Sequence, residues 1–190
     1  VLAWLAGESW RMKVFKEGGD IYCASASAMF GVPVVKHGIN GHLRQKGKVA
    51  ELALGYGGGP NALIAMGALK MGLTEDELPD IVSKWRGSNT RIKSYWYKVE
   101  KAAMDAMEKA APQDIGHGMC FARESNLLYG YDYLTIKLPS GRKLYYPQPV
   151  LGPNRFGGQE IKYKTWAGTH WMYNGTYAGK LVENITQAVA

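Results

Sequence analysis

Apolar side chains recur every three or four positions over most of the first 111 residues, which is the pattern of amphipathic helices. Asp20 is the expected N-cap of one helix, residues 74–77 form a capping box that opens another, and Pro112 ends the longest. The predicted helices cover residues 1–16 as one or two short segments, 21–30, 42–57, 61–71, a segment that opens at 74, and 90–111.

From Asn126 onward the period becomes two, as in strands. Residues 131–146 form a predicted hairpin that turns at Pro139-Ser140-Gly141, and residues 159–173 form a second β-rich stretch. Lys, Tyr and Trp interleave in that stretch, which fits contact with nucleic acid but is also routine for exposed antiparallel strands. The expected fold is mainly α with a small antiparallel β region (α+β). Residues 1–125 are expected to form a helical core, residues 126–175 a β-rich hairpin region, and residues 176–190 a helix.

Residues 43–59 combine cations, an aromatic ring and a run of glycines. Because an α-helix turns about 100° per residue, side chains spaced by four share one stripe; these are Arg44, Lys48, Leu52 and Tyr56. A cation in the first turn of a helix opposes the helix dipole by roughly 0.3–1 kcal/mol, and a bound anion would remove that cost. A polyphosphate on the cations, with its base stacked on the ring, is therefore one interpretation. The other is an amphipathic surface helix with solvated cations and a Leu and a Tyr in the core.

The same stretch, Arg44-x3-Lys48-x7-Tyr56-Gly57, resembles motif B, the fingers O-helix, of family A DNA polymerases, and especially of their phage and prophage members. Three further stretches resemble that family in the same order. Residues 1–7 are similar to what directly follows motif A, and residues 20–33 to the helix before the O-helix. Residues 181–187 are similar to the start of a helix that carries a glutamine to the primer–template minor groove.

The resemblance implies a polymerase fingers-like subdomain with residues 42–57 as its O-helix. Arg44 and Lys48 would hold the incoming triphosphate, and Lys48 would also be a catalytic proton donor to the departing pyrophosphate. Tyr56 and Gly57 would border the nascent base pair and the template. The glycines at 57–59, followed by Pro60, would end the helix abruptly and leave room for the template.

Three more positions follow from the same resemblance. Gln187 would read the minor groove of the DNA by a hydrogen bond. Leu52 occupies the place where the family usually has Phe or Tyr against the sugar, and Tyr22 the place where bacterial members carry a histidine near the triphosphate. Gly141-Arg142 is similar to a Gly-Arg pair in a hairpin of the bacterial enzymes.

Nucleotidyl transfer uses divalent metals held by carboxylates, and in this family those aspartates belong to motifs A and C. The 190 residues resemble the part between the two motifs, so we expect no metal ligands here and Mg²⁺ bound elsewhere in a full-length DNA-directed DNA polymerase. The fragment itself is expected to be inactive. The expected partners are a DNA template-primer and deoxynucleoside triphosphates, without a membrane.

Two other functions fit the same residues. A single-subunit phage-type RNA polymerase uses a similar Arg-x3-Lys-x7-Tyr-Gly helix, although the context at residues 20–33 favours the DNA enzyme. A non-catalytic nucleic-acid-binding module, or a purely structural helical domain, would also account for a basic surface helix.

Composition agrees with an anionic partner, since the net charge is +7 and the pI is near 9.3. The two cysteines, Cys23 and Cys120, form no CxxC pair, and the four histidines show no metal-ligand spacing, so no structural zinc is expected. A reduced chain in the cytoplasm of a bacterial host or phage-infected cell is the expectation.

Overall fold

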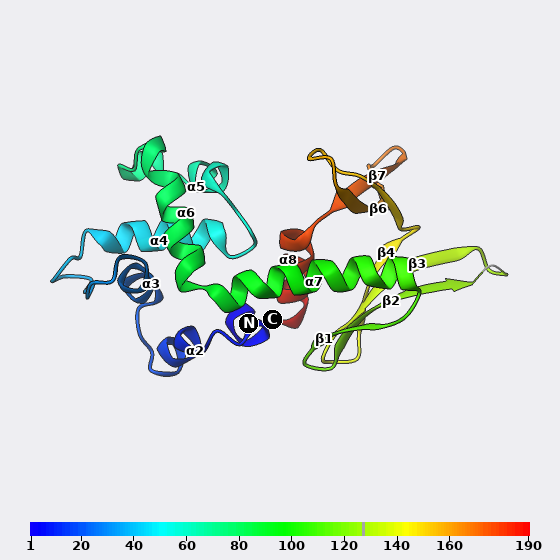
Figure 1. Cartoon of the computed structure of the whole chain (residues 1–190), viewed down its shortest axis with the longest axis horizontal. Helices are drawn as coiled ribbons and strands as arrows, with labels where there is room; N and C mark the ends of the chain where they lie inside the picture. The colour runs from blue at the N-terminus through cyan, green and yellow to red at the C-terminus, as the bar shows by residue number, and fades with distance from the viewer. Residues whose placement is uncertain (127) are drawn as a thin grey trace. The chain divides into compact units, whose positions relative to one another are not determined.

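The computed structural model describes residues 1–126 and 128–190, which fold as two compact units, residues 1–95 and 96–190 (Figure 1). The first unit is helical. Its elements are α1 (Leu2–Ala6), α2 (Ser9–Lys16), α3 (Ile21–Phe30), α4 (Leu43–Leu54), α5 (Pro60–Ala65), the 3-10 helices η1 (Leu69–Met71) and η2 (Glu75–Glu77), α6 (Leu78–Ser88) and the start of α7 (Thr90–Lys109).

The predicted helix starts are confirmed where side-chain caps define them. The Asp20 carboxylate accepts hydrogen bonds from the backbone N–H groups of Tyr22, at 2.9 Å, and Cys23, at 3.2 Å, and so opens α3. Thr74 and Glu77 form the reciprocal capping box ahead of α6. Local side-chain chemistry is therefore enough to place these two helix starts.

Two helix predictions are corrected. The helix expected over 61–71 is broken into α5 and η1, because Gly67 adopts φ +86°, a left-handed conformation that a continuous helix excludes. The helix expected over 42–57 ends at Leu54, although Gly55 keeps helical angles of φ −56° and ψ −28°. A tighter turn follows, in which the N–H of Gly57 donates to the carbonyl of Leu54 at 3.2 Å.

The second unit contains the rest of α7, two antiparallel sheets and α8 (Ala178–Val189). One sheet has the order β1-β2-β3-β4 and the other β5-β6-β7. The strands are β1 (Gln113–Gly116), β2 (Met119–Asn126), β3 (Tyr131–Lys137), β4 (Lys143–Pro147), β5 (Val150–Pro153), β6 (Gln159–Trp166) and β7 (Trp171–Thr176). The predicted α+β class, the hairpin over 131–146 and the final helix are confirmed.

Strand β1 and all but the last residue of β2 lie within residues 1–125, which we expected to be a helical core, so the change to strand begins at Gln113 and not at Asn126. Helix α7 ends at Lys109, and Ala110 takes φ +52°. Met119 and Phe121 are fully buried, and the one residue between them is Cys120, which is half-buried and gives little polar contrast, so the alternation in the sequence is weak.

A single hydrogen-bonded contact illustrates how the second unit is held together. Ile161 of β6 and Val182 of α8 are buried, and the Asn184 side chain donates to the hydroxyl of Tyr146 at 2.9 Å. The ring of Tyr146 meets that of Tyr163 edge-on, with centroids 4.9 Å apart. Burial raises the pKa of Tyr146 to about 12. None of the helices in the described residues is long and apolar enough to cross a membrane.

Candidate nucleotide site on helix α4

Helices α3 and α4 approach each other backbone to backbone at Gly47. A Cβ atom at this position would overlap the carbonyl oxygen of Tyr22 and would lie 3.0 Å from the Cβ of Ala26. Only glycine allows such an approach. The consequence is that side chains one turn away on the two helices meet.

Arg44 of α4 meets the start of α3 in this way. Its Nε donates to the Asp20 carboxylate at 2.7 Å, and its guanidinium carbon lies 5.2 Å from the centre of the Tyr22 ring. Burial of the Asp20 carboxyl opposes ionisation, but the hydrogen bonds from Arg44 and from the backbone of α3 outweigh it, so the pKa of Asp20 lies below its ordinary value. The same bond raises the pKa of Arg44. Two residues of the sequence-predicted site, Arg44 and Tyr22, are thus in contact, together with an aspartate that was predicted only as a cap.

The first turns of α4 carry no acidic residue, as expected, but the neighbouring elements supply two. Besides Asp20 at Arg44, Glu77 pairs with Lys46 at 2.7 Å. The hydrogen bond from Lys46, with one from the backbone of Thr74, lowers the pKa of Glu77 to about 2. An outside anion is therefore not needed to relieve Arg44 and Lys46, because the protein itself provides carboxylates for both.

Lys48 differs from its two neighbours. Across residues 1–126 and 128–190, no carboxylate lies within ion-pairing distance of its ammonium group, and the side chain is half-buried. The positive charge at the start of the helix is therefore concentrated here. Lys48 is the cation of α4 best placed to receive an anionic ligand.

Leu52 and Tyr56 continue the same stripe toward the end of the helix. Leu52 is 48% exposed, and Tyr56 lies half-buried in the turn that follows α4. The opposite face, with Gly47, Ala50 and Leu54, is buried. The stripe from Arg44 to Tyr56 is therefore accessible along its length and is not part of the core.

The glycine run after Tyr56 is held in one conformation. Gly57 adopts φ +79°, and a Cβ on Gly58 would overlap the carbonyl oxygen of Ala53. Arg86 of α6 donates to the carbonyl of Gly58 at 3.1 Å. These contacts need glycine at both positions and place the backbone of the turn close to the end of α4.

A buried polar network, which no pattern in the sequence predicts, anchors the other side of α4. Glu51 accepts both terminal nitrogens of Arg11 and the indole N–H of Trp85, the last at 2.9 Å. The guanidinium also lies over two indole rings, 4.9 Å from the centre of Trp10 and 5.5 Å from that of Trp85. The partners are 40 and 34 positions from Glu51 in the chain, so no local pattern reveals them.

Gln187, the predicted minor-groove residue, belongs to the second unit and is exposed on α8. Its amide donates to Glu183 at 3.2 Å. The side chain borders a hollow of about 490 Å³ that Tyr145, Tyr163 and Asn184 also line. An amide in such a position has room to make hydrogen bonds with a ligand.

In the part of the chain that the structure describes, no group of three or more His, Cys, Asp or Glu side chains is arranged to hold a metal ion. Cys23 and Cys120 are both free thiols. The chemistry available at α4 is therefore that of cations, an aromatic ring and backbone amides.

The accessible stripe on α4 runs from a guanidinium and an ammonium group, which can bind phosphates, to a phenol ring, on which a planar group can stack. Comparison with known proteins adds an independent observation. The entire chain is 51% identical to part of a protein named DNA polymerase from Bacillus phage SP02. The chain spans 29% of the length of that protein. No protein-family model matches the chain.

Proposed function

We propose that these residues are the nucleotide-handling, fingers-type portion of a template-directed DNA polymerase of family A. The observation that carries the proposal is the 51% identity over the whole chain to a phage protein named DNA polymerase. The accessible stripe on α4 supports it physically, because the stripe offers charge for phosphates and a ring for a base.

In this proposal the ligand-free site is held ready by Asp20. The Asp20 carboxylate accepts from Nε of Arg44, so the two Nη groups of the guanidinium remain to donate to a phosphate. The same bond restrains the Arg44 side chain to one orientation. Lys48, which has no carboxylate partner among the described residues, would bind the same polyphosphate and donate a proton to the departing pyrophosphate. Tyr56 and Gly57 would border the base pair that forms, and Leu52 the sugar.

Outside α4, we propose one residue that contacts DNA and no residue that binds a metal. Gln187, exposed on α8, would contact the minor groove of the primer-template. Mg²⁺ does not fit the described residues, which offer no cluster of ligands, and so its carboxylates are proposed to belong to other parts of the polymerase. No step on α4 passes through a metal.

The test is nucleotide incorporation by the full-length polymerase with single substitutions on α4. Arg44→Ala and Lys48→Ala should each lower incorporation by orders of magnitude, because each removes a positive charge of the protein that would bind the triphosphate. Lys46→Ala is the matched control: it lies in the same helix, but its ammonium is already paired with Glu77. Circular dichroism should show an intact fold in all three.

Incorporation that is unchanged in Arg44→Ala and Lys48→Ala would refute the assignment. A loss that is equal in all three variants would also count against it, since it would indicate a general electrostatic effect of the helix.

A further inference from the structure

The outer face of the β5-β6-β7 sheet is built from alternating cations and aromatic rings. Residues directly opposite in an antiparallel pair share a face. Lys164 pairs with Tyr173, and Trp166 pairs with Trp171. Lys162, two residues before Lys164, points to the same side. The interleaving seen in the sequence thus becomes one face of a sheet.

The aromatic rings on this face are not part of a core. Trp166 is 56% exposed, Trp171 59% and Tyr173 44%. On the reverse face Ile161 is buried and Tyr163 packs against Tyr146. The two indoles at the surface have centroids 5.5 Å apart. Large apolar side chains gathered on one exposed face of a protein mark a binding surface.

The other sheet of the same unit contributes a second row of rings. Tyr131 and Tyr133 of β3 have centroids 5.8 Å apart, and Tyr133 and Tyr145 of β4 have centroids 5.6 Å apart. Tyr131 and Tyr145 are exposed. The two rows of aromatic rings would belong to one binding site if a pocket lay between them.

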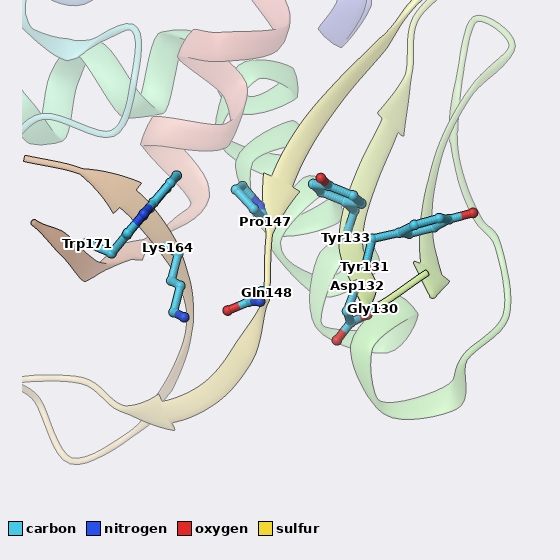
Figure 2. Close-up of a pocket in the computed structure, with 8 residues that line it drawn as sticks. All are labelled: Gly130, Tyr131, Asp132, Tyr133, Pro147, Gln148, Lys164 and Trp171. Atoms are coloured by element: carbon cyan, nitrogen blue, oxygen red, sulfur yellow. The ribbon is translucent and has the colours of Figure 1, made fainter. Parts of the chain in front are cut away.

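Such a pocket is present, and Figure 2 shows it between Trp171 and Lys164 on one side and Tyr131 and Tyr133 on the other. Its volume is about 260 Å³. Sites for drug-sized ligands occupy roughly 300–1,000 Å³, so this one suits a smaller planar group.

Polar groups are placed at the rim of this pocket. The Gln148 side chain points toward Lys164 (Figure 2), and its backbone is held at φ +46°, a conformation that is rare outside glycine and collects at ligand sites. Arg123 grips the Asp132 carboxylate with two hydrogen bonds, at 3.0 and 2.7 Å. These bonds occupy both carboxylate oxygens, so the polar groups available to a ligand are the amide of Gln148 and the ammonium of Lys164, which can bond to the acceptors and donors on the edge of a nucleobase.

The charges on this surface favour a nucleic acid over a protein segment. Lys164 has no carboxylate within ion-pairing distance in the described parts of the chain, and its ammonium lies 5.9 Å from the Tyr173 ring. Lys162 has only a long contact, 3.8 Å, with Glu160. Cations beside exposed rings are the combination that binds single strands, in which phosphates meet the charge and unstacked bases meet the rings.

We propose that this surface, which we call the aromatic cleft and define by Tyr131, Tyr133, Pro147, Gln148, Lys164 and Trp171, binds single-stranded DNA with one base in the pocket. The choice of DNA rests on the proposed function. A duplex suits the cleft less well, because its bases are stacked on one another, whereas an unstacked base of a single strand is free to stack on an exposed aromatic ring.

The test uses the full-length polymerase and measures its affinity for a fluorescent oligo-dT and for a blunt duplex of equal length by anisotropy. Trp171→Ala should weaken oligo-dT binding by roughly 5- to 150-fold, because one stacked base is lost. Trp171→Phe should retain most of the affinity. Lys164→Gln should reduce the slope of log affinity against log salt by about 0.7, the value for one phosphate of a single strand.

Tyr97→Ala is the matched control, since Tyr97 of α7 is also 59% exposed but does not line the cleft. It should bind oligo-dT like the parent. Unchanged oligo-dT binding in Trp171→Ala, or an equal loss for the duplex, would overturn the inference. Incorporation on a primer-template with a one-nucleotide overhang should be unchanged in Tyr97→Ala and impaired in Arg44→Ala, so incorporation reports on the α4 site and oligo-dT binding reports on the cleft.

Discussion

Gly47→Ala tests the contact that sets the geometry of the α4 site. The new Cβ would overlap the carbonyl oxygen of Tyr22 and lie 3.0 Å from both the Cβ and the backbone nitrogen of Ala26. Backbone atoms cannot rotate aside, so α3 and α4 must separate. Overpacking of this kind lowers the free energy of unfolding by about 1–3 kcal/mol. We expect a value at the upper end, because the new Cβ would clash with backbone atoms of both Tyr22 and Ala26.

Alanine also favours a helix over glycine by about 1 kcal/mol, which offsets part of the clash. The expected net loss in the free energy of unfolding is therefore about 2 kcal/mol. Separation of the helices would also stretch the 2.7 Å bond between Arg44 and Asp20, so nucleotide incorporation by the full-length protein should fall as well.

Urea unfolding followed by circular dichroism measures the first effect, and amide hydrogen exchange over residues 22–29 localises it. Gly87→Ala is the control: Gly87 lies in α6, has no atom within 4 Å of a built Cβ, and should gain up to about 1 kcal/mol. If Gly47→Ala stabilises the protein as Gly87→Ala does, the close approach of α3 and α4 is not a constraint and the argument for the site geometry fails.

Two further predictions concern carboxylates of the first unit. Glu51→Ala should lower the free energy of unfolding by about 3–5 kcal/mol, because the Arg11 guanidinium, only 6% exposed, would be left without its partner, and a loss below about 1 kcal/mol in urea unfolding would contradict the buried network. Glu77 has its pKa lowered to about 2, so its contribution is complete above the ordinary carboxyl value and is lost as the pH falls toward 2. The difference in urea midpoint between the parent and Glu77→Gln should accordingly be constant near neutral pH and should shrink as the pH falls toward 2. A difference that does not change with pH would exclude the Lys46–Glu77 pair as its source.

Part of the α4 site could be predicted from the sequence, because it depends on spacing within one helix. The four-residue interval of Arg44, Lys48, Leu52 and Tyr56 determines that they share a stripe, and the structure leaves this stripe accessible. The caps at Asp20 and Thr74 are equally local. Contacts between residues only a few positions apart depend on the local sequence alone, so the sequence pattern is sufficient to predict them.

Which cations of α4 have a carboxylate partner was decided by the tertiary structure. Asp20 reaches Arg44 across 24 positions and Glu77 reaches Lys46 across 31, because Gly47 lets α3 lie against α4 and the capping box turns η2 toward it. The aromatic cleft likewise joins strands of two sheets. Residue order determines which side chains share one helix or strand, but which elements then pack together depends on the whole set of burial and steric constraints, and no single stretch contains that information.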